Sequence, residues 1–468
     1  MYNYTIRPTD RTQVPRDTSQ SGFMMLLTKV GRDGSLLRNL AGWMQSYLDC
    51  PRRLLPWRCT GGIFAAALSL LGPFTLVGCE SAPVRAVRRV EFVRTLFSDR
   101  DHVADFRNMK AFFPTVRVPT SGSPSVLAQG PQTDLPTSFD FRRTQIDTAS
   151  FLDLTDTTGL IVIKDDKIVF ERYFRGTDAH TRTVAWSVSK PFVSALIGIA
   201  VGEGKIQSIS DPVTRYVPEL AGSAYDGVRI KDVLQMSSGA RWNEDYSDPH
   251  SDVVRFGHAV AFGHSLDAFA ASLPREHAPG TYLRYNSMDT QVLGMVLCRA
   301  TGMSLAAYLS THLWQPLGMQ DDAYYLTDRG GVEFAAGGLN ATLRDYARLG
   351  LLYAHDGNWH GTQIIPPEWV RASTIPDAPQ LMPGRRPSST EIWGYGYHWW
   401  IPDLQGDYVA VGIFNQFIYV NPRQHLVIVK SSANHTYGTG RGYDETKDRE
   451  STHLALFKAI EMALSNGA

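Results

Sequence analysis

Cysteine is scarce in this chain, which has four thiols among 468 residues, at Cys50, Cys59, Cys79 and Cys298. Their spacing matches no metal-binding motif, and only Cys298 lies beyond Cys79, so we expect neither a cysteine metal centre nor a disulfide framework. A surplus of charge is also missing, because 46 Lys and Arg residues face 46 Asp and Glu residues. Nucleic-acid binding needs a basic surplus or a concentrated basic face, so a nucleic-acid partner is not expected.

Metal-ligand spacing is absent among the histidines as well. The thirteen histidines are scattered, and none pairs with a carboxylate at the spacing of a metal site, so no metal and no cofactor is expected. What the chain does have is apolar material, with 43% hydrophobic residues, which is ample for a large core.

An uncharged apolar run, GGIFAAALSLLGPFTLVGC, follows three arginines and ends at Cys79. A basic region before an apolar run that closes in small residues is typical of an export signal. The four residues from Leu76 to Cys79 resemble the lipobox of bacterial lipoproteins, in which the cysteine is lipidated and becomes the new N-terminus. A membrane-spanning helix is the alternative, since the run is near the lower length limit for spanning.

We therefore expect residues 44–79 to be a lipoprotein-type signal that begins at Met44. We would then expect the protein to be exported to the periplasm and to contact a bacterial membrane only through a lipid anchor on Cys79. Residues 1–43 would be a disordered extension or lie ahead of the true start. Residues 80–136 have scattered charges and then the stretch VPTSGSPSVLAQGPQTDLP, which is rich in Pro, Ser and Gly. They predict a tether plus a segment that covers the main domain, which we expect over residues 137–468.

The order of periodic segments predicts the fold of that domain. TGLIVIKDDKIVFERYFRG has two β-rich runs around Asp165 and Asp166, which indicates a hairpin. Helical patterns follow, and further β-rich runs and one helix close the chain. Strands at both ends with helices between them predict an α/β (α+β) fold, with a central antiparallel sheet flanked by helices and an inserted all-helical region.

A serine and a lysine stand three residues apart at the head of the apolar helical segment WSVSKPFVSALIGIA. On a helix, Ser187 and Lys190 share one face, so the amine can reach the hydroxyl, and apolar neighbours would lower the pKa of the lysine. A serine made nucleophilic by a neighbouring base is the core of acyl-enzyme chemistry. The pattern alone also fits an N-cap serine with a surface lysine.

A tyrosine strengthens the first interpretation. Tyr285 stands directly before a helical segment about a hundred residues later, in GTYLRYNSMDTQVLG, and a tyrosine near a lysine can relay the proton that the serine loses. The order of these motifs, followed by a strand that ends at Gly412, favours catalysis over a chance turn.

With these motifs the chain from about Ser138 onward resembles the serine β-lactamase and penicillin-binding protein superfamily, of which S-x-x-K is a signature. It is most similar to the class C-like branch that includes the 6-aminohexanoate-dimer (nylon-oligomer) hydrolases and related esterases. The segments that carry the resemblance are AWSVSKPFVSALIG, VLQMSSGARWNEDYSDP, YNS, GGLNATLRDYARLG, YGYHWW and GIFNQFIYVNP. The resemblance implies that Ser187 is the nucleophile, Lys190 its activating base and Tyr285 the group that passes the proton to the leaving amine or alcohol.

Further site residues follow from the same resemblance. Tyr246 matches a substrate-contacting tyrosine, and Ser287 stands where class C enzymes carry Asn and the nylon-oligomer hydrolases carry Ser. Gly412 would let its strand approach a bound acyl group closely, so that the backbone N–H groups of Ser187 and Ile413 form an oxyanion hole. Trp399 and Trp400 are expected to line the pocket, with a core position as the alternative for each.

One departure from the family pattern bears on the substrate. The third motif of the family, K-T-G or H-T-G, aligns with Ala410-Val411-Gly412, so the cation that binds the carboxylate of a β-lactam or peptide is absent there. We therefore expect a serine hydrolase that cleaves a small-molecule amide or ester through an acyl-enzyme. A β-lactamase or D-alanyl-D-alanine carboxypeptidase/penicillin-binding receptor is the first alternative, and a non-catalytic binding module is the second. The oligomeric state stays open.

Overall fold

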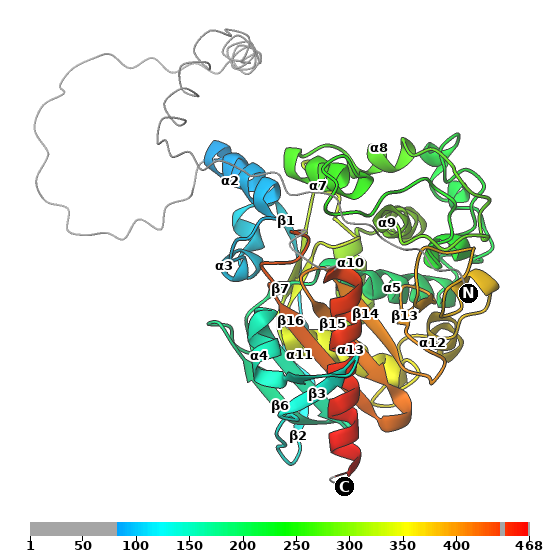
Figure 1. Ribbon diagram of the computed structural model, residues 1–468. Coiled ribbons are helices and arrows are strands. Elements are labelled where there is room, and N and C mark those ends of the chain that lie inside the picture. The colour runs from blue at the N-terminus through cyan, green and yellow to red at the C-terminus, as the bar shows by residue number, and fades with distance from the viewer. Residues whose placement is uncertain (1–81, 440–444, 467–468) are drawn as a thin grey trace, which may run out of the picture. The chain divides into compact units, whose positions relative to one another are not determined.

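An eight-stranded sheet forms the centre of the computed structural model, which describes residues 82–439 and 445–466 (Figure 1). Every pair of neighbouring strands in it is antiparallel except the edge pair β6 and β2, which is parallel. In spatial order the strands are β12 (Gly394–Tyr395), β13 (Trp400–Ile401), β14 (Tyr408–Gly412), β15 (Gln416–Asn421), β16 (Leu426–Ser432), β5 (Thr157–Lys164), β6 (Lys167–Tyr173) and β2 (Ala128–Gln129).

The pattern of apolar residues explains why both faces of this sheet are buried. In β5, Ile161 and Ile163 belong to the main core, whereas Leu160 and Val162 belong to a second core on the opposite face. Successive side chains of a strand point to opposite faces, so a continuous apolar run fills both. β5 and β6 join through Asp165 and Asp166, at φ values of 49° and 63°, as the predicted hairpin requires.

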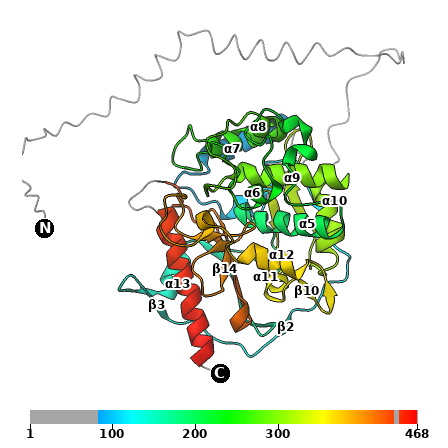
Figure 2. The ribbon, with the colours of Figure 1, turned by 90° about the vertical axis from the view of Figure 1, so that its right-hand side faces the viewer.

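Helices cover the two faces of the sheet. Figure 2 shows α13 on one side of β14 and α11 with α12 on the other. The helices are α2 (Ala82–Thr95), α3 (Val103–Phe106), α4 (Thr148–Leu154), α5 (Lys190–Gly202), α6 (Ile230–Leu234), α7 (Asp252–Phe262), α8 (Leu266–Ala271), α9 (Ser287–Thr301), α10 (Leu305–Leu309), α11 (Leu343–Ala354), α12 (Pro367–Thr374) and α13 (Glu445–Asn466). With α5 to α10 inserted between β6 and the last strands, the predicted α/β fold is confirmed.

A second, smaller sheet of four strands includes β7, the strand that directly precedes the turn with Ser187. Its strands, in spatial order, are β1 (Thr115–Val118), β8 (Ala323–Leu326), β9 (Leu339–Ala341) and β7 (Thr183–Val184). Two hairpins complete the strands, β3 (Ser138–Phe141) with β4 (Thr144–Asp147), and β10 (Asn358–Trp359) with β11 (Thr362–Gln363). β7 pairs with β9, which anchors the chain directly before Ser187.

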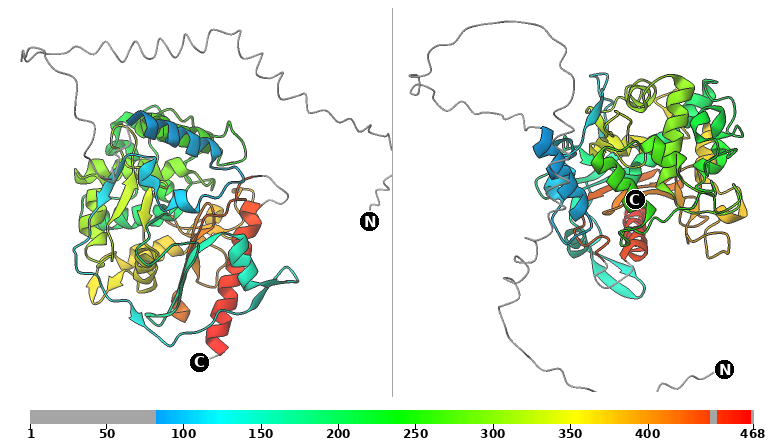
Figure 3. Two further views of the ribbon diagram at one scale, coloured as in Figure 1. Left: turned by 90° about the vertical axis from the view of Figure 1, so that its left-hand side faces the viewer. Right: turned by 90° about the horizontal axis from the view of Figure 1, so that it is seen from above.

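Residues 82–137, the described part of the segment before Ser138, pack as part of the domain and do not form a tether. Phe92, Phe106 and Met109 are buried in the main core, and β1 pairs with β8 along its whole length. α2 packs against α7, as the left panel of Figure 3 shows. The compact unit therefore starts before residue 137, because the aromatic side chains of this segment supply core surface. The predicted signal, Cys79 and residues 1–43 lie outside the described residues.

Candidate active site

Ser187 lies in a single 3-10 turn, Trp186–Ser189, between β7 and α5. Trp186 has a φ of 47°, a left-handed conformation that bulky residues rarely adopt and that costs about 1–3 kcal/mol. Its ring packs on Phe106 and Phe414, with ring centroids 5.4 and 5.8 Å apart, which holds the conformation. The turn is therefore held by tertiary packing in a form that the local sequence does not favour.

Lys190 is the first residue of α5 and is buried, as the helix spacing predicts. Its Nζ donates hydrogen bonds to Ser187 Oγ at 2.8 Å and to the Ala336 carbonyl at 2.9 Å. Burial lowers the pKa of Lys190 to about 8, although the negative charge of Glu244 acts in the opposite direction. Near neutral pH the amine can therefore lose its proton and act as a base toward the serine.

Tyr285 stands beside this pair, two residues before α9. The Lys190 Nζ lies 5.0 Å from the centroid of its ring, and the ring stacks on Trp400 with a centroid separation of 5.0 Å. Burial and the charge of Glu244 raise the pKa of Tyr285 well above 10, while a hydrogen bond with Ser187 lowers it by less. Tyr285 is therefore a neutral phenol that can hold or pass a proton, and the structure brings the three predicted residues together.

Glu244 is the main residue that sequence reasoning missed. Its carboxylate accepts hydrogen bonds from Tyr246 Oη at 2.7 Å, Ser287 Oγ at 2.6 Å and Ser287 N at 3.1 Å, and a further one from Trp242 Nε1. This one side chain thus fixes both predicted substrate-contacting residues, Tyr246 and Ser287. A signal was available, because Glu244 stands two residues before Tyr246 in the segment WNEDYSDP, which carries part of the family resemblance.

Gly412 ends β14 and brings that strand against the nucleophile turn. A Cβ atom there would lie 2.7 Å from the Ala185 carbonyl oxygen, a contact that real Cβ atoms do not make. Glycine therefore permits the strand to approach the turn, and Ile413 follows it in the lining of the cavity that contains Ser187. Ala410 lies on the same strand, paired with Ile418 and buried in the main core, and offers no charge.

The two tryptophans of YGYHWW differ in position. Trp399 is fully buried and packs on Tyr353 and Tyr408, with ring centroids 4.8 and 5.1 Å apart. Trp400 is half-buried, lines the cavity and stacks on Tyr285. Neighbouring side chains of an extended segment point to opposite sides, so only one of the two can face the site. The expectation that Trp399 lines the pocket is therefore wrong, and Trp399 is a core residue.

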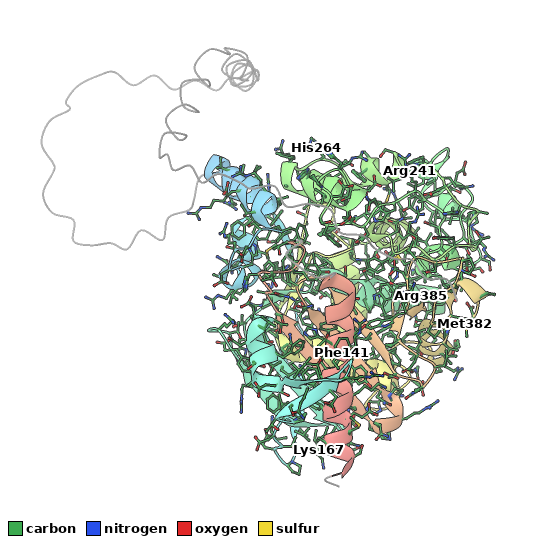
Figure 4. All side chains as sticks on the ribbon, viewed as in Figure 1. Phe141, Lys167, Arg241, His264, Met382 and Arg385 are labelled. Carbon is green, nitrogen blue, oxygen red and sulfur yellow. The ribbon has the colours of Figure 1, made fainter. Side chains whose placement is uncertain are left out.

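A cavity of about 990 Å³ opens over Ser187, Tyr285 and Trp400. Its rim is polar, and two of its cationic side chains are paired, Arg284 with Glu276 and Arg255 with Asp252. A third, Arg241, is exposed and lies at the outer surface on the helical side of the molecule (Figure 4). Within the described residues no group of three or more His, Cys, Asp or Glu side chains is placed to hold a metal ion.

A serine hydroxyl held by a buried lysine amine, beside a neutral tyrosine and under an open cavity, defines a serine hydrolase of the S-x-x-K type. The chain belongs to the beta-lactamase family, whose model matches residues 154–452.

Relatives within this family include amide and ester hydrolases. The 6-aminohexanoate-dimer hydrolase of Paenarthrobacter ureafaciens is 32% identical over 291 residues, which cover 60% of this chain and 74% of that protein. Esterase EstB of Burkholderia gladioli is 35% identical over 148 residues, or 29% of this chain and 36% of the esterase. A solved structure from Bacillus anthracis, provisionally assigned as a 6-aminohexanoate-dimer hydrolase, covers 79% of this chain and 97% of its own, with a TM-score of 0.69 at 23% identity.

Proposed function

We propose that this serine hydrolase cleaves an acyclic amide or ester, with Ser187 as nucleophile and Lys190 as its base. The observation that carries the proposal is the 2.8 Å hydrogen bond from Lys190 Nζ to Ser187 Oγ, made by an amine whose pKa is about 8. A base whose pKa lies near the working pH is the most effective general base, because it is both available and strong enough. A structural lysine would gain nothing from this burial.

In the first half of the reaction, Ser187 Oγ attacks the acyl carbon and its proton passes to Lys190. The backbone N–H groups of Ser187 and Ile413 would donate to the developing oxyanion. Tyr285 then gives its proton to the leaving amine or alkoxide as the bond to the acyl carbon breaks, and takes the proton held by Lys190. In the second half, water attacks the acyl-Ser187 ester and its proton passes to the neutral Lys190 amine. Lys190 then returns this proton to Ser187 Oγ as the ester bond breaks, which releases the acid and free Ser187.

Two features favour acyclic substrates over β-lactams. Ala410 provides no cation at the position where the family binds a carboxylate, and the cavity arginines Arg255 and Arg284 already pair with carboxylates. A relative that is 32% identical over 291 residues is a 6-aminohexanoate-dimer hydrolase, which by its name acts on a dimer of 6-aminohexanoate. A β-lactamase remains the second candidate because it uses the same nucleophile and base.

The test combines active-site labelling with substrate comparison. A fluorophosphonate probe is expected to label Ser187, as read from peptide masses, and Ser187→Ala should abolish labelling and turnover. Ser194→Ala, at a second buried serine on α5 outside the cavity, is the matched control and should retain both. Nitrocefin should be turned over at least about a hundredfold less well than p-nitrophenyl butyrate, since a lost charge contact costs roughly 3 kcal/mol. Labelling at another residue would refute the mechanism, and efficient nitrocefin turnover would favour the β-lactamase.

We also propose that the protein is exported and lipid-anchored through Cys79, which the arginine-flanked apolar run before that residue supports. Among the described residues no single helix is long and apolar enough to cross a membrane, although the bent pair Ser287–Thr301 and Leu305–Trp314 passes by length and composition. Metabolic labelling with a fatty acid should modify the full chain but not its Cys79→Ser variant. Equal labelling of both would contradict the anchor.

A further inference from the structure

Two cavities meet at the nucleophile. The larger one, of about 990 Å³, is open and has many polar and charged side chains in its lining, whereas a second one of about 100 Å³ is lined almost entirely by apolar side chains. Three residues line both cavities: Ser187, Tyr246 and Ile413. An acyl carbon bound at Ser187 therefore has two routes open to its substituents, one polar and one apolar.

The small cavity lies between the N-terminal segment and α7. Its walls include Phe92, Leu96 and Met109 on one side and Val253, Phe256 and Val260 on the other. Gly257 lies on the same face of α7 as Val253 and Val260, and a Cβ atom built there would meet no atom within 4 Å. Glycine in a helix interior costs about 1 kcal/mol of stability relative to alanine. Gly257 therefore leaves room in the small cavity at a cost in the stability of α7.

The position of the proton donor assigns one cavity to each half of the substrate. Tyr285 lines the large cavity but not the small one. The leaving group must receive its proton from that phenol and then diffuse out, and the hydrolytic water must enter from the same side. The acyl group stays on Ser187 through both events, so it belongs in the small cavity.

We propose that the small cavity is the acyl subsite and that it takes a short, straight, uncharged aliphatic chain. This inference rests on the proposed function of Ser187. None of the described residues that line the small cavity is Asp or Glu, and its one histidine, His258, is exposed at the rim. An ammonium group at the end of the acyl chain would therefore be desolvated without a partner, which is costly.

The volume and the chemistry set the expected selectivity. A space of about 100 Å³ takes roughly three methylene-sized groups, since a water molecule occupies about 30 Å³. Burying one methylene group is worth about a fourfold gain in kcat/KM. Activity should therefore rise by about fourfold per carbon from acetyl to about pentanoyl and then level off or fall. A 6-aminohexanoyl ester should react at least about tenfold more slowly than the hexanoyl ester.

Two variants resize the cavity in opposite directions. Val93→Ala removes part of its wall on α2 and should move the optimum one or two carbons longer, whereas Gly257→Leu should move the optimum toward acetyl. Val87→Ala is the matched control, because Val87 lies on the same helix, is 71% exposed and does not line the cavity.

The experiment measures kcat/KM for p-nitrophenyl esters from acetyl to decanoyl, and in parallel the rate at which alkyl fluorophosphonates of the same lengths label Ser187. Opposite shifts of the optimum in the two variants, with no shift in Val87→Ala, would support the acyl subsite. If the wild type and both variants were labelled and active but showed the same dependence of kcat/KM on acyl chain length, the acyl subsite alone would be overturned. If no probe of any length labelled Ser187, the proposed function would fall, and the subsite with it.

Discussion

The acid limb of the pH–rate profile gives the sharpest test of how Lys190 works. The amine must be neutral to accept the proton of Ser187, and its pKa is about 8. The neutral fraction is then about 1% at pH 6, about 9% at pH 7 and half at pH 8. We expect kcat/KM for a p-nitrophenyl ester to rise nearly tenfold per unit below pH 7 and to level off above pH 8.5.

Glu244 tunes this limb. Its negative charge favours the ammonium form of Lys190, so it raises a pKa that burial alone would lower further. Glu244→Gln should therefore move the inflection to lower pH. The same change should lower the plateau, because the carboxylate accepts four hydrogen bonds and a glutamine would present its NH₂ group to some of those donors.

The assay is a series of initial rates at constant ionic strength between pH 5.5 and 9.5, with buffers overlapped to remove specific effects. Glu276→Gln is the matched control, because Glu276 lines the same cavity but pairs with Arg284 and is not among the charges that shift the pKa of Lys190. A flat wild-type profile would show that Lys190 is not the base. An inflection that moves to higher pH in Glu244→Gln would refute the electrostatic argument.

Three other substitutions test separate parts of the site. Tyr246→Phe should slow amide hydrolysis by about tenfold or more and leave ester hydrolysis nearly unchanged, because only a leaving amine needs assistance to depart. Since Tyr246 donates its proton to Glu244, the lone pair of its hydroxyl oxygen is the part that can contact the substrate. Equal losses of amide and ester hydrolysis would mean that Tyr246 only shapes the pocket. Gly412→Ala places a Cβ against the Ala185 carbonyl and should lower kcat by about a hundredfold, because it displaces the strand that contributes to the oxyanion hole. Gly202→Ala is the control and should not lower kcat, because the added Cβ makes only an ordinary van der Waals contact. Normal activity in Gly412→Ala would contradict the close approach of β14 to the nucleophile turn. Lys190→Met should abolish turnover yet raise the free energy of unfolding by about 3 kcal/mol at pH 7, because lowering the pKa from 10.5 to about 8 destabilises the fold at about 1.36 kcal/mol per unit. That gain should be complete below pH 8 and shrink between pH 8 and 10.5, as the folded protein releases a proton that the unfolded chain still holds, and a less stable variant in urea titrations would contradict it.

Short-range relations were predictable from the chain itself. The three-residue spacing predicted that Ser187 and Lys190 would be in contact, although packing on Trp186 holds the turn that carries Ser187, and the hairpin at Asp165 and Asp166 follows from turn chemistry. The continuous apolar run of β5 likewise accounts for a sheet that is buried on both faces. Tyr285 could be named only through the order of motifs and the family resemblance.

Long-range packing decided the rest. The sequence does not show which of Trp399 and Trp400 faces the cavity, because the tight turn before the short strand β13 decides to which side each of the two side chains points. Nothing local indicates that Phe92, far ahead of the predicted domain, helps to form a wall beside Ser187. The identity and close spacing of the reacting groups could be predicted from the chain, since Ser187 and Lys190 stand only three residues apart. The pKa of that base and the space around the acyl carbon could not be predicted in this way, because desolvation and cavity shape depend on packing between segments that are distant in the chain.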